Sequence, residues 1–74
     1  MSNGNVFLLI ECKHQRTILV THSAKIALKY LVPGVRVDIW RNNHRVRKVL
    51  ASDKFELLEY VKQEAEYLSQ GGKQ

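Results

Sequence analysis

The 74-residue chain has one cysteine, one proline and one tryptophan, and no long apolar run. The lone Cys12 excludes an internal disulfide, and one thiol with scattered histidines offers too few ligands for a structural zinc ion. No apolar run approaches the ~20 residues that a membrane helix needs. The opening residues have no basic region and Glu11 interrupts their apolar run, so no signal peptide is predicted. These absences favour a reducing, cytoplasmic setting without membrane contact.

Recognisable catalytic features are missing as well. The sequence has no Gly-rich phosphate loop, no carboxylate pair in a familiar setting and no nucleophile beside an obvious base. Its histidines, His14, His22 and His44, fall in three different predicted turns. We therefore expect no enzyme, no cofactor and no metal.

The charge is unevenly distributed along the chain. The net charge is +5, but residues 1–51 carry nine Lys or Arg against two acids, whereas residues 52–74 carry three bases against five acids. This asymmetry predicts a basic face that would attract an anionic partner. Simple solubility is the alternative explanation. A hydrophobic content of 45% favours one folded domain over residues 1–70, with a flexible tail at 71–74.

The first half of the sequence predicts a hairpin and a short helix. Residues 6–12 and 16–21 are β-branched or aromatic runs of strand length, separated by three polar residues. Ser23 is then placed to cap a helix whose apolar stripe would end before Pro33-Gly34.

A second hairpin is predicted around Asn42-Asn43, because asparagine tolerates the positive φ angles of a two-residue turn. Residues 35–41 and 44–50 would be its strands. Counting back from the turn pairs Ile39 with Val46 and Asp38 with Arg47. A bulge near Arg47-Lys48 would then bring Val49 inward.

The clearest helix is predicted from about residue 53 to 69, with Ser52 as its cap. Its expected inner stripe, centred on a fully buried Leu58, is Phe55, Leu58, Val61, Ala65 and Leu68. The element order ββαββα predicts an α+β fold, in which a mainly antiparallel four-stranded sheet carries both helices on one face. The other sheet face would remain open.

The second hairpin is the strongest candidate site. Guanidinium groups suit phosphates and carboxylates alike, and a tryptophan can stack on a base or anchor in a protein pocket. Nucleic-acid binding, protein docking and a charged hairpin that merely resists aggregation all remain open from this pattern. The candidate binding residues here are Arg36, Trp40, Arg41, His44, Arg45, Arg47 and Lys48.

The first hairpin is unusual because both of its faces are apolar. Val6, Leu8, Ile10 and Cys12 would face one way, and Phe7 and Leu9, with Ile18 and Val20, the other. A sheet covered on one side normally alternates, so a helix, the chain tail or another molecule must cover the second apolar face. Exposed apolar patches often mark protein contacts. Phe7 and Leu9 are therefore added to the predicted partner surface.

A small basic chain with stretches such as VFLLIEC and RNNHRVRK and no catalytic residues resembles the small host-takeover proteins of bacteriophages. That group includes a Xanthomonas-phage transcription inhibitor and antiterminator that binds bacterial RNA polymerase. The resemblance implies a regulator in the host cytoplasm that binds RNA polymerase and inhibits or redirects transcription. We expect a protein partner with an acidic and apolar surface, and a monomer or weak dimer. Sequence-independent nucleic-acid binding through the 36–48 hairpin is the alternative.

Overall fold

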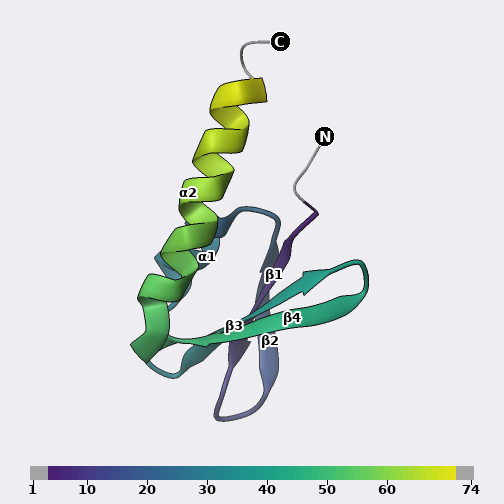
Figure 1. Cartoon of the computed structure of the whole chain (residues 1–74). Coiled ribbons are helices and arrows are strands. Elements are labelled where there is room, and N and C mark those ends of the chain that lie inside the picture. Colours follow the sequence, from purple (N-terminus) through teal and green to yellow (C-terminus); the bar gives the residue numbers. More distant parts are fainter. Residues whose placement is uncertain (1–3, 72–74) are drawn as a thin grey trace.

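The computed structural model describes residues 4–71, with side chains described as far as Glu66. It confirms the order ββαββα and the α+β fold class (Figure 1). The elements are β1 (Val6–Glu11), β2 (Arg16–Thr21), α1 (Ala24–Tyr30), β3 (Val35–Arg41), β4 (His44–Leu50), a 3-10 turn (Ala51–Asp53) and α2 (Lys54–Gly71). Residues 72–74 of the predicted tail lie outside the described residues, and Gly71 is the last residue of α2.

The four strands form one antiparallel sheet in the order β2-β1-β3-β4, and both helices lie on one side of it (Figure 1). Strand residues that point toward the helices alternate with residues that point away, so the core draws on every second strand position. The core between sheet and helices consists of Phe7, Leu9, Ala24, Ala27, Leu31, Val37, Ile39, Val49 and Leu57, each at most 1% exposed.

Two local predictions are confirmed. Ser23 is the N-cap of α1, and its hydroxyl oxygen accepts a hydrogen bond from the backbone N–H of Ile26 at 3.3 Å. Asn42 and Asn43 form the two-residue turn between β3 and β4, with φ angles of 54° and 66°. These positive angles give the turn the twist that matches its flanking strands.

The predicted pairing of the second hairpin is wrong beyond its first two pairs. The register shifts between Ile39 and Trp40, so Val46 is the extra residue and Ile39 pairs with Arg47. The bulge therefore lies nearer the turn than expected, and Asp38 pairs with Lys48 instead of Arg47. Its consequence was predicted correctly, because Val49 is fully buried in the core.

The predicted inner face of α2 is also wrong except at Val61, which packs against the core; the side chain of Leu68 lies outside the described residues. Leu57 is fully buried, whereas Leu58 is 45% exposed and Phe55 is 65% exposed. The inward side instead carries Leu57 and Tyr60, whose ring meets Phe7 edge-on at 6.1 Å between centroids. Rotating the stripe by one residue turns a helix face by about 100°, which moves Leu58 from the core to the surface.

Ser52 does not cap α2. It lies inside the 3-10 turn that precedes the helix, and that turn has no side-chain cap hydrogen bond. The cap prediction failed because the chain leaves β4 through this tighter turn, which takes up the position expected for the start of the helix.

The faces of the first hairpin differ from the prediction. Phe7 and Leu9 are fully buried beneath the helices, so they are not available to a partner. Val20 does not share their face, because it pairs with Leu8 and so points to the side without helices. A bulge at Ile18, between the pairs of Leu9 and Ile10, breaks the alternation on which the prediction relied.

Candidate functional site

The side of the sheet without helices, called the open face below, is the candidate site. Opposite residues on paired strands share a face, so the register defines its rows. Val6 lies opposite Trp40, and Leu8 lies between Val20 and Asp38. Ile10 lies opposite Arg36 in the next row. The open face is therefore apolar over β1 and β2, and over β3 and β4 it combines charged residues with Trp40 and Leu50.

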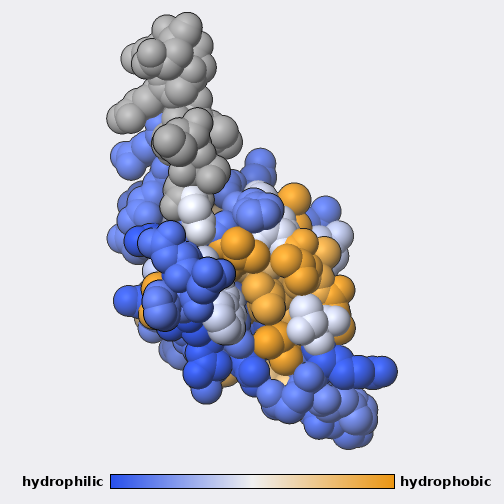
Figure 2. Space-filling model, turned by 90° about the vertical axis from the view of Figure 1, so that its right-hand side faces the viewer, coloured by the Kyte–Doolittle hydropathy of each residue, from blue (hydrophilic) through white to orange (hydrophobic). Residues whose placement is uncertain are grey.

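The apolar half of the open face is exposed on its outer strand. Val20 is 58% exposed and Ile18, at the bulge, is 54% exposed, while Val6 and Leu8 are partly buried. Figure 2 shows one face of the molecule with a hydrophobic patch bordered by hydrophilic surface. A β-sheet of this size is ordinarily covered or polar on its second face, so the patch is a surface that a partner could cover.

The charged half is organised around one buried carboxylate. Asp38 is 3% exposed. Its Oδ1 accepts a hydrogen bond from Arg36 Nε at 3.1 Å, and its Oδ2 forms an ion pair with Arg45 Nη1 at 3.7 Å. The Arg36 Nη1 group also donates to Gln15 Oε1 at 2.9 Å. Burial of a charge is tolerated only when it is paired. These two arginines therefore compensate the charge of Asp38, which leaves one net positive charge in the group, and both are less free to bind an outside anion.

Two further predicted site arginines are held by other parts of the chain. Arg47 shares the helix-facing side with Ile39, and its Nη1 lies 2.9 Å from Glu56 Oε1 in α2. Arg41 donates from Nε to Asn5 Oδ1 at 2.9 Å. The structure therefore splits the predicted basic cluster between the two sides of the sheet.

Of the remaining predicted residues, His44 and Trp40 lie near the hairpin tip and Lys48 lies toward the far end of β4, opposite Asp38. His44 and Lys48 are exposed, and neither side chain makes a hydrogen bond or ion pair with the described part of the chain. Trp40 is partly buried beside Val6, and its indole N–H is buried with no acceptor among the described residues. Because that N–H is inaccessible, Trp40 offers a partner its ring rather than its donor.

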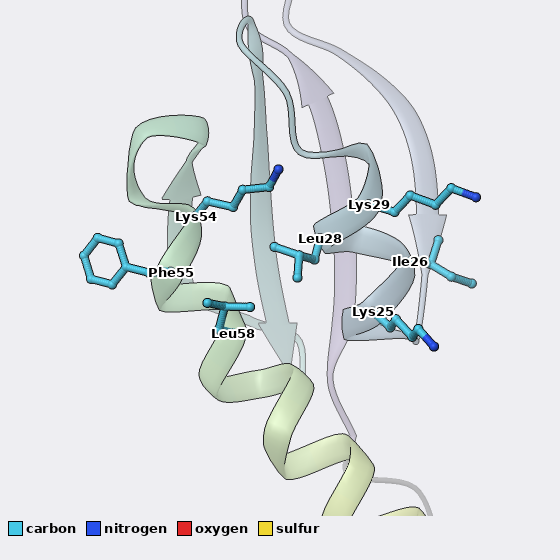
Figure 3. Close-up of a pocket in the computed structure, with 7 residues that line it drawn as sticks. All are labelled: Lys25, Ile26, Leu28, Lys29, Lys54, Phe55 and Leu58. Atoms are coloured by element: carbon cyan, nitrogen blue, oxygen red, sulfur yellow. The ribbon is translucent and has the colours of Figure 1, made fainter.

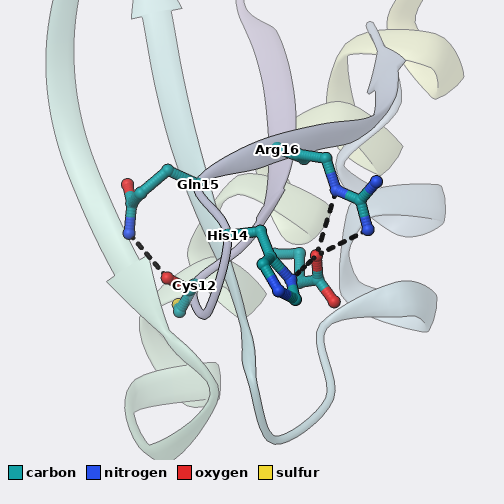
Figure 4. Close-up of polar contacts among 5 residues, drawn as sticks. Cys12, His14, Gln15 and Arg16 are labelled. Atoms are coloured by element: carbon teal, nitrogen blue, oxygen red, sulfur yellow. Dashed lines mark hydrogen bonds and ion pairs between the residues drawn. The ribbon is translucent and has the colours of Figure 1, made fainter.

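The turn between β1 and β2 contains the only histidine contact in the described region. His14 Nδ1 lies 3.1 Å from Glu11 Oε1, and Arg16 donates to the same oxygen at 3.4 Å (Figure 4). Gln15 donates to the carbonyl of Cys12 at 2.7 Å. No group of three His, Cys, Asp or Glu side chains within residues 4–66 is placed to hold a metal ion.

Sequence reasoning placed Phe7 and Leu9 on the partner surface, but both are buried beneath the helices, and an exposed apolar residue of the open face is Val20. The alternation of β1 puts Leu8 on the open face, and Val20 shares that face because it pairs with Leu8. The bulge at Ile18 interrupts the alternation of β2, so this pairing could not be predicted by counting residues from the turn.

Among the described residues, no helix is both long and apolar enough to cross a membrane.

No family model, curated protein or solved structure matches this chain.

Proposed function

We propose that the chain is a small non-enzymatic protein-binding regulator that docks through the open face. The observation that carries this proposal is the exposed apolar patch around Val20, next to the ring of Trp40 and a charged margin. Such a patch supplies the desolvated centre that holds a complex, and the charged margin orients the partner.

Protein docking accounts for the arrangement of the arginines better than nucleic-acid binding does. A protein that grips a phosphate backbone needs several free cations along one surface. Here Arg36 and Arg45 are paired with Asp38, and Arg47 is paired with Glu56 on the other side of the sheet. Nucleic-acid binding through the 36–48 hairpin is retained as the alternative and has a distinct experimental signature.

Bacterial RNA polymerase is the partner that the resemblance to phage host-takeover proteins suggests. In that case the chain acts in the host cytoplasm and inhibits initiation or suppresses termination. An acidic and apolar surface on the polymerase would complement Lys48 and Val20, both of which are exposed.

Binding to purified core and holo RNA polymerase, measured by biolayer interferometry, tests the proposal. Val20→Asp places a charge in the patch and should weaken binding by at least about tenfold, because a buried unpaired charge is costly. Val32→Asp is the matched control, since Val32 is 45% exposed but lies in the α1–β3 loop.

Run-off and terminator read-through transcription then show which step is affected. Absence of polymerase binding, together with tight binding to random DNA or RNA that falls steeply with salt, would favour the nucleic-acid alternative instead.

A further inference from the structure

A second apolar surface lies on the opposite side of the molecule, between the two helices. It is a groove of about 700 Å³, called the interhelix groove below. Ile26 and Leu28 line it from α1, and Phe55 and Leu58 line it from α2. In Figure 3, Leu28 extends from α1 toward α2, whereas Phe55 and Ile26 point outward on opposite sides.

The side chains in this groove are unusually exposed for their type. Phe55 is 65% exposed, Leu58 is 45% exposed and Ile26 is 43% exposed. Core packing does not account for them, because α2 turns Leu57 inward instead. Large exposed apolar groups along one groove are the usual mark of a binding surface.

The rim of the groove is basic. Lys25 and Lys29 of α1 and Lys54 of α2 complete the lining, and none of the described lining residues is acidic. None of these lysines forms an ion pair within the described residues, although Lys29 Nζ lies 5.7 Å from the ring centroid of Tyr30. The rim therefore presents uncompensated positive charge to a partner.

We propose that the interhelix groove binds an acidic amphipathic helix of a partner protein. A groove between two helices accepts the apolar stripe of a third, at positions i, i+3, i+4 and i+7. The seven residues of α1 rise about 10 Å, so the groove contacts about two turns of the incoming helix. Glutamates or aspartates beside that stripe then meet the three lysines.

This surface is independent of the open face, since the sheet separates the two. With both occupied, the chain bridges two protein segments, one on each side of the sheet.

The probe is a fluorescein-labelled designed peptide of about 14 residues, which forms about four helical turns. It carries leucine at the stripe positions and glutamate elsewhere. A companion peptide has lysine in place of every glutamate. Fluorescence anisotropy with the full chain should show saturable binding of the acidic peptide and no binding of the basic one.

Two kinds of variant locate the binding. The triple variant Lys25→Glu, Lys29→Glu, Lys54→Glu should bind the acidic peptide at least about tenfold more weakly, because three exposed ion pairs are lost. Phe55→Ala keeps the three lysines of the rim but removes an apolar side chain that meets the leucine stripe, so it should weaken binding of the acidic peptide. Circular dichroism checks that this variant keeps its fold. Lys13→Glu is the charge control, and Val20→Asp keeps full peptide binding because it alters only the open face.

Several results would overturn the inference. These are no binding of the acidic peptide, equal binding by the triple variant, or loss of peptide binding in Val20→Asp. Stronger retention on phosphatidylserine vesicles than on the peptide would identify a membrane contact instead. A concentration-dependent dimer that Phe55→Ala abolishes would identify a second copy of the chain as the occupant.

Discussion

Adjacent leucines in α2 provide a direct test of how this helix packs. Leu57 is fully buried among the core residues, and Leu58 is 45% exposed at the interhelix groove. The same substitution to alanine at each position removes the same atoms from two different environments. The comparison therefore isolates burial from helix propensity, which is equal for the two variants.

The expected magnitudes follow from the two burials. Leu57→Ala removes a fully buried side chain and should cost about 2–5 kcal/mol, including the cavity that it leaves. Leu58→Ala removes about three carbons that are only half withdrawn from water, which corresponds to about 1 kcal/mol. A chain of this length has about 4–11 kcal/mol of total stability, so Leu57→Ala should consume a large share of it.

Urea unfolding followed by circular dichroism at 222 nm measures both values. Thermal melts should place Leu57→Ala at least about 5 °C below Leu58→Ala in a domain of this size. If Leu57→Ala does not fold, Leu57→Val, which deletes about one methylene, should still cost about 1 kcal/mol. Equal losses, or a larger loss at Leu58, would show that α2 presents the opposite side to the sheet.

Three further substitutions test contacts elsewhere. Glu64→Ala should cost about 1–2 kcal/mol in urea unfolding, because Glu64 Oε1 accepts the Ala24 N–H of the α1 N-terminus at 2.7 Å; the exposed Glu59→Ala should cost clearly less. Asn43→Gly should leave the Tm unchanged or higher, whereas Asn43→Val should lower it, because φ is 66° there. Arg47→Ala should cost up to about 1 kcal/mol through its half-exposed ion pair, and a loss no larger than that of Lys48→Ala would refute a role for that pair.

The hairpins could be predicted from sequence because their information is local. Alternation in β3 and the conformational tolerance of Asn42 and Asn43 are properties of a few neighbouring residues, and both gave the right strands and turn. The position of the bulge is not local. It depends on which residue of β4 can leave the ladder while Val49 enters a core built from four other elements, and several positions satisfy that requirement equally in the sequence.

The charged residues of the candidate site show a related limit. The sequence correctly predicts a concentration of arginines along 36–48, but it does not show which are already paired. Arg41 meets Asn5 across 36 positions, and Arg47 meets Glu56 only because α2 returns over β4. Pairing of this kind is decided by the tertiary fold. It leaves Lys48 and His44 as the predicted basic residues whose side chains make no hydrogen bond or ion pair within the described residues.

The inward face of α2 was misread for a physical reason that Glu64 makes clear. Two apolar stripes overlap in this helix, one through Leu57 and one through Leu58. The stripe through Leu57 runs into Glu64, so a pattern based on hydrophobicity rejects it. In the folded chain, however, the Glu64 carboxylate caps α1, accepting from the Ala24 N–H at 2.7 Å and from the Ser23 hydroxyl at 3.2 Å. A carboxylate that accepts hydrogen bonds from two donors at a helix N-terminus is stable on an inward face. Those donors lie about 40 positions away in the sequence, so the sequence of α2 alone does not show that Glu64 can face inward. The helix therefore packs through the stripe of Leu57, and Phe55 and Leu58 face solvent.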